Sequence, residues 1–101
     1  METFVFCYHV KPHPISKYLN VKEAWAIIWT LAKNIEDAEK IALDCIARNN
    51  WIAIENLKKS NIPEAPCLSE KINHLHYKKA QELGVSMFLS TVPFPQLGFK
   101  N

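Results

Sequence analysis

The residues best suited to do chemistry lie near the N-terminus, where Cys7 and His9 are followed by His13. Side chains two residues apart on a β-strand face the same way, so a strand here places the thiol and the imidazole together. Such a pair can act as a nucleophile with its base, or join a second imidazole in a metal site. Cys7 and His9 are therefore the candidate catalytic residues, and Cys7, His9 and His13 form an alternative metal site. We favour packing for the thiol and an ordinary hydrogen bond for His9, because the spacing is unspecific and no acid or amide partner is evident.

The other chemical motifs are weaker. His74 and His76 stand two apart on a predicted helix, about 200° around its axis, so they cannot chelate one ion together. His76 lies on the apolar stripe of that helix, which predicts burial and a lowered pKa. The chain has two glycines, Gly84 and Gly98, and so lacks a glycine-rich phosphate loop. We expect no cofactor and no bound metal, and an enzyme is the less favoured class.

Charge excludes one class of partner. The formal net charge is +2, and the basic residues are lysines except for Arg48. Arginine's planar guanidinium is the usual group for bidentate recognition of phosphate or guanine. Specific binding to nucleic acid is therefore not expected.

The cysteines and the hydropathy pattern indicate a cytoplasmic protein. Three cysteines, Cys7, Cys45 and Cys67, give an odd count without the spacing of a disulfide framework. The N-terminus has an acidic second residue and no basic region before its short apolar stretch, so no signal peptide is predicted. The longest apolar run, Ala24–Ala32, reaches about half the length of a membrane span, and no membrane partner is expected.

Three segments alternate in the manner of strands. Thr3–Val10 places aromatic and β-branched residues at every second position and stops before two prolines. Trp51–Leu57 and Val85–Val92 show the same period. We expect strands at all three.

Two segments carry helix signals. After Asn34, a capping residue, acidic residues fill the first turn and an apolar stripe runs to about Asn50. Ser69 caps a second helix that ends at Leu83, with Gly84 in the position of a left-handed C-cap.

The segment Glu23–Lys33 fits two patterns. As a helix it would continue into the helix after Asn34, giving about thirty residues with two tryptophans on opposite sides. As a strand it places its larger side chains on one face and the smaller ones on the other. We favour the strand, because a continuous helix would ignore the start signal at Asn34.

These elements predict one α+β domain over residues 1–101, in the order β-β-α-β-α-β, with an irregular C-terminal tail at 93–101. We expect a two-layer sandwich in which a four-stranded mixed sheet carries two helices. The helix between Glu23–Lys33 and Trp51–Leu57 would make a parallel crossover unit. In element order the chain resembles ferredoxin-like and dimeric α+β-barrel proteins, although those begin β-α-β. This likeness implies no activity.

The predicted sheet raises the question of what covers its second face. If both helices lie on one side, the strand Glu23–Lys33 leaves large apolar side chains uncovered, which a homodimer packed sheet on sheet would bury. If one helix lies on each face, a monomer suffices. We expect a small protein-binding or regulatory module that acts through self-association or another protein partner, with a small enzyme or metal-binding protein as the alternative. The predicted partner-binding residues are Trp25, Ile27, Trp29, Leu31, Phe94 and Phe99.

Overall fold

The computed structural model describes residues 1–17, 20–60 and 69–91. The sheet contains four strands: β1 (Glu2–Pro12), β2 (Ala24–Ala32), β3 (Trp51–Ser60) and β4 (Val85–Ser90). The helices α1 (Ile35–Arg48) and α2 (Glu70–Leu83) follow β2 and β3. The α+β class and the element order are confirmed, and β2 settles the ambiguous segment in favour of a strand.

The strands lie in the order β3-β1-β2-β4, and every neighbouring pair is antiparallel. The prediction of a mixed sheet is therefore wrong. β2 and β3 do run in the same direction, as the crossover through α1 requires, but β1 lies between them. Nothing in this topology confirms a ferredoxin-like character.

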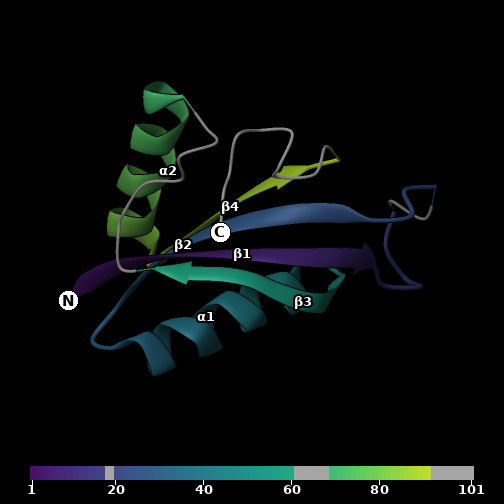
Figure 1. Ribbon diagram of the computed structural model, residues 1–101, viewed down its shortest axis with the longest axis horizontal. Coiled ribbons are helices and arrows are strands. Elements are labelled where there is room, and N and C mark those ends of the chain that lie inside the picture. Colours follow the sequence, from purple (N-terminus) through teal and green to yellow (C-terminus); the bar gives the residue numbers. More distant parts are fainter. Residues whose placement is uncertain (18–19, 61–68, 92–101) are drawn as a thin grey trace.

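The two helices cover opposite faces of the sheet (Figure 1). On one face Ala38, Ala42 and Ile46 of α1 pack against alternate residues of β1 and β2, including Phe6 and Ile28. On the other face Ala80 of α2 joins a smaller cluster, made with Val5, Cys7, Ile27 and Trp29. This arrangement differs from the predicted two-layer sandwich, because each face carries one helix.

Local signals account for the helix boundaries. The Asn34 side chain accepts a hydrogen bond from the Asp37 backbone N–H at 2.8 Å, and the Ser69 hydroxyl accepts one from Ile72 at 3.2 Å. Gly84 ends α2 with φ +88°, a conformation that glycine adopts without steric cost. Its carbonyl accepts from the Leu31 N–H at 2.9 Å and so ties the end of α2 to β2.

The two buried faces match the alternation in the sequence. In the β1–β2 register Cys7 lies opposite Ile27 and Val5 opposite Trp29, on the face of α2. Two irregularities interrupt the pairing of β1 with β3, between Cys7 and Tyr8 and between His9 and Val10. In the described part of the chain, no helix is long and apolar enough to span a membrane.

Candidate functional site

Cys7 and His9 share a face of the sheet, as predicted, but their surroundings differ. Cys7 is fully buried in the cluster beneath α2. His9 lies nearer the surface, where its ring stacks on Trp25 with centroids 5.1 Å apart. His9 Nε2 and Glu23 Oε1 are 2.5 Å apart. The predicted hydrogen bond of His9 is thus present, and its partner is a carboxylate fourteen residues away.

His13 belongs to a different part of the molecule. Its backbone N–H donates to the Asn50 carbonyl at 2.9 Å, which holds it beside the end of α1. Among residues 1–17, 20–60 and 69–91, no three histidine, cysteine or acidic side chains gather as a metal site. The structure therefore does not bring Cys7, His9 and His13 together.

The predicted partner-binding residues of β2 are mostly internal. Ile27 and Trp29 are fully buried within the chain, whereas Trp25 and Leu31 are half-buried. Phe94 and Phe99 lie outside the described residues. Since α2 lies on this face, the argument for a sheet-on-sheet dimer no longer holds.

His76 of α2 is buried against the same face. Its ring stacks on Trp29, with centroids 4.7 Å apart, and meets Phe88 edge to face at 5.8 Å. Its Nδ1 lies 2.6 Å from the Ser86 hydroxyl oxygen. Burial lowers the pKa of His76, and the nearby Lys79 ammonium lowers it further. The direction predicted from its position on the stripe is confirmed.

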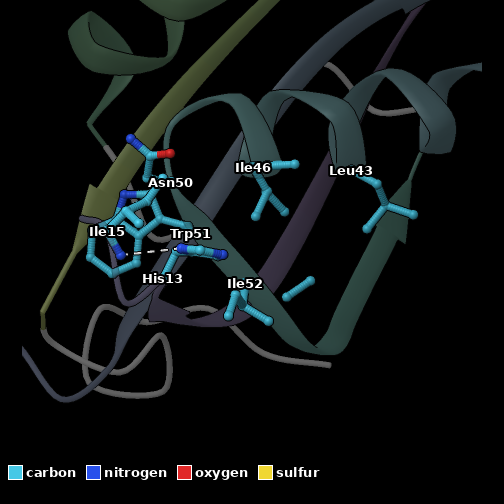
Figure 2. Close-up of a pocket in the computed structure, with 9 residues that line it drawn as sticks. His13, Ile15, Leu43, Ile46, Asn50, Trp51 and Ile52 are labelled. Atoms are coloured by element: carbon cyan, nitrogen blue, oxygen red, sulfur yellow. Dashed lines mark hydrogen bonds between the residues drawn. The ribbon is translucent and has the colours of Figure 1, made fainter.

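An open apolar hollow lies on the face of α1, at the end of that helix. This groove has a volume of about 530 Å³. Figure 2 shows it between the last turns of α1 and the start of β3, with the turn after β1 beside it. Its lining consists of His13, Ile15, Leu43, Ile46, Ala47, Asn50, Trp51, Ile52 and Ala53.

The groove has an exposed aliphatic rim. Ile15 is 73% exposed and Leu43 is 42% exposed, whereas Ile46 and Trp51 beneath them are buried. None of the nine lining residues is aspartate, glutamate, lysine or arginine. Ile15 and Leu43 are the large apolar side chains of the groove that face solvent.

Two residues supply polar groups to the groove. The Ile15 backbone N–H donates to His13 Nδ1 at 3.2 Å, so Nδ1 is the acceptor in this contact and Nε2 is the second ring nitrogen, which can face a partner. In Figure 2 that second nitrogen lies on the side of Ile52, away from Ile15. Asn50, at φ +62°, has the left-handed conformation that turns the chain from α1 into β3.

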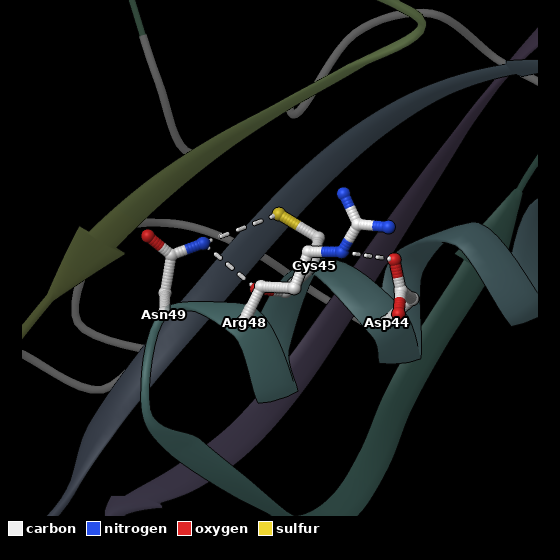
Figure 3. A network of polar contacts seen from close by, with 4 residues as sticks. All are labelled: Asp44, Cys45, Arg48 and Asn49. Atoms are coloured by element: carbon white, nitrogen blue, oxygen red, sulfur yellow. Dashed lines mark hydrogen bonds and ion pairs between the residues drawn. The ribbon is translucent and has the colours of Figure 1, made fainter.

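A second hollow, of about 380 Å³, lies between α1 and the turn that joins α2 to β4. Figure 3 shows its polar edge, where Arg48 pairs with Asp44 at 2.8 Å and Asn49 donates to the Cys45 carbonyl at 2.8 Å. The Asn49 amide also lies 3.7 Å from the Cys45 sulfur. Burial raises the pKa of Cys45, and the Asp44 carboxylate raises it further. A thiol in this environment stays protonated near neutral pH and is a poor nucleophile.

Sequence reasoning missed the groove, although one signal for it was available. Leu43 lies off the apolar stripe of α1, which runs through Ala38, Ala42 and Ile46, and a leucine facing solvent is a feature to note. Ile15 gave no such signal, because it follows Pro14 and belongs to none of the predicted strands or helices. Only the folded chain brings these two side chains to one hollow.

Comparison with known proteins adds no relative: no family model, curated protein or solved structure matches the chain. The function of the groove is therefore inferred from the residues that line it and from their contacts.

Proposed function

We propose that the protein is a small protein-binding module and that the groove between α1 and β3 is its docking surface. The observation that supports this is the combination of an apolar floor with the exposed rim residues Ile15 and Leu43. Burying a large aliphatic side chain stabilises a complex by about 1.5–3 kcal/mol. The two rim residues thus provide the driving force for docking.

The shape of the groove favours a protein over a small molecule. A small-molecule site typically encloses about 70–90% of its ligand. Here the rim residues themselves remain in contact with solvent, so an occupant would be covered on one side only. A bulky aliphatic side chain on a protein surface suits this geometry, because the rest of the partner then shields the rim.

The polar groups of the groove add specificity. His13 Nε2–H is a donor at the edge of this largely apolar surface. It suits a partner that offers a carbonyl or carboxylate oxygen beside its aliphatic residue. The odd number of cysteines leads us to place this module in the cytoplasm.

A random peptide library displayed on phage tests the proposal with a defined probe. We expect the selected peptides to share a bulky aliphatic residue. Leu43→Glu should weaken their binding by about 10-fold or more, since it removes an apolar contact worth at least about 1.4 kcal/mol.

Leu75→Glu is the matched control. Leu75 is also a half-exposed leucine on a helix, 51% exposed on α2, and it does not line the groove. Binding should be unchanged in this variant. A selection that enriches no aliphatic peptide, or peptides that bind both variants equally, would contradict the proposal.

A further inference from the structure

In the described part of the chain, helix α2 is held on its face of the sheet by few apolar contacts. Its buried residues are Asn73, His76 and Ala80, and only Ala80 is an aliphatic member of the cluster on this face. The larger side chains of Leu75 and Leu83 are 51% and 74% exposed. On the opposite face α1 packs into a larger apolar cluster. The attachment of α2 is therefore weaker than that of α1.

His76 is the largest buried side chain in this attachment. Its ring stacks on Trp29 of β2 and meets the edge of Phe88 of β4. Its Nδ1 lies 2.6 Å from the hydroxyl of Ser86, which is also on β4. One titratable ring thus joins the middle of the helix to two strands.

Two further contacts hold α2 near its C-terminal end. Gln81 Nε2 donates to Thr3 Oγ1 at 2.6 Å, and the Gly84 carbonyl accepts from the Leu31 N–H at 2.9 Å. None of these groups titrates near neutral pH, so this end can stay attached as a hinge. The rest of the helix relies on His76, and a detached helix of 14 residues is only marginally stable in water.

The surroundings of His76 oppose a positive charge on its ring. β2 and β4 contain no charged residue, and β1 places the Cys7 thiol on this face, with His9 further along the strand. Among the described residues, the charged group that acts on His76 is the Lys79 ammonium, which with burial lowers the pKa of the ring. The face of Trp29 attracts a cation, but the lowered pKa means that burial and Lys79 outweigh this attraction. A proton on His76 therefore favours a conformation in which the ring reaches water.

We infer that α2 is an acid-sensitive cover: a proton on His76 opens this helix about its Gly84 end and uncovers Ile27 and Trp29, while α1 and the sheet stay folded. The groove between α1 and β3 lies on the other face, so the inference does not depend on the proposed function. In the open form His76 regains an ordinary pKa, near 6.5. The open population should therefore rise by up to about 10-fold for each unit that the pH falls below 6.5, until the folded-state pKa is reached.

Amide hydrogen exchange followed by NMR between pH 7.5 and pH 5 tests this inference, with protection factors corrected for the intrinsic pH dependence of exchange. The amides of residues 76–80 in α2 should lose protection as the pH falls, by the factor given above. The amides of residues 42–46 in α1 should keep theirs. His76→Phe, which retains an aromatic ring on Trp29, should make the protection of α2 independent of pH. His74→Phe changes an exposed histidine of the same helix and should behave like the wild type.

Two exposed lysines give a second test that leaves the buried face of α2 intact. Lys79→Gln removes the ammonium that opposes the proton on His76, so it should reduce the loss of α2 protection at pH 5. Lys78→Gln, at the adjacent exposed lysine, is the matched control and should leave that loss unchanged.

Three results would overturn the inference. The first is a wild-type α2 whose protection does not change with pH, and the second is an equal loss in α1 and α2, which is global unfolding. The third is an acid response that persists in His76→Phe or that Lys78→Gln reduces as much as Lys79→Gln does.

Discussion

The contact between His76 and Ser86 gives a prediction whose magnitude follows from the structure. His76 Nδ1 lies 2.6 Å from the Ser86 hydroxyl oxygen, and both residues are buried. Ser86→Ala leaves a buried ring nitrogen without its partner, which costs about 1–3 kcal/mol. For a chain of 101 residues this corresponds to a fall in Tm of about 4–24 °C.

His76→Phe keeps an aromatic ring on Trp29 but leaves the Ser86 hydroxyl unpaired. The double variant has neither polar group, so its loss of stability should be smaller than the sum of the two single losses by about 1–3 kcal/mol. Urea unfolding of the wild type, the two single variants and the double variant completes this double-mutant cycle. It is measured at pH 8, where the imidazole is neutral in the folded and the unfolded state. His74→Phe in place of His76→Phe is the control, because His74 is exposed on the same helix.

If the stability losses of the two single variants add up to the loss of the double variant within about 0.5 kcal/mol, the reasoning is refuted. This result would mean that the short contact between His76 and Ser86 contributes nothing to the stability of the folded chain. A coupling of the expected size would instead show that a polar pair fastens this helix to the face that contains Trp29.

Three further predictions follow. The folded-state pKa of His76 lies below the unfolded value near 6.5, so the free energy of unfolding should fall as the pH drops through 6.5. His76→Phe should reduce this dependence of stability on pH, measured by urea unfolding from pH 8 to 5. The buried Tyr8 hydroxyl makes no hydrogen bond of normal geometry among the described residues. Burial, together with the Glu39 carboxylate, raises the pKa of Tyr8 to about 12, whereas the nearby Asn56 side chain lowers it. The folded state should therefore lose stability as the pH rises above 10, and Tyr8→Phe should remove that loss in alkaline unfolding curves while leaving stability at pH 7 unchanged or higher by about 1 kcal/mol. Asn34→Ala removes the cap of α1 and should cost about 0.5–2 kcal/mol in thermal unfolding, with no change expected for Asn34→Asp beyond a few tenths.

The alternating strands could be predicted because burial acts on every second residue. The large side chains of β2, such as Trp29, were assigned to one face and the small ones, such as Ala26, to the other, and both clusters agree. The neighbours of each strand could not be predicted in the same way. The alternation of apolar residues along a strand shows which side chains face the same side of the sheet. It does not show which strands are neighbours, and so it could not predict that β3 pairs with β1 instead of β2.

The placement of the helices was left open for a similar reason. The apolar stripe of α1 shows which side of the helix is buried, but it carries no information on which face of the sheet receives it. The stripe of α2 is thin, with Asn73, His76 and Ala80 as its buried residues, and a histidine takes the place of a large aliphatic side chain. Stacking of His76 on Trp29 depends on tertiary contact alone.

The candidate site was the least predictable part. His13 was singled out for metal chemistry with Cys7 and His9, and the chain turns it instead toward the end of α1. Its position depends on a backbone hydrogen bond to Asn50, a residue thirty-seven positions later. No local pattern predicts such a contact, which brings His13 to the edge of the groove.

The central claim is that the groove between α1 and β3 is the surface through which this protein meets its partner. Amide chemical shifts followed while a selected aliphatic peptide is added to the protein test it most directly, because they report the contact residue by residue. We predict shifts that gather at Ile15, Leu43 and Ile52. Shifts that gather instead around Trp25 and Leu31 of β2, or a spectrum that does not change as the peptide is added, would contradict the account.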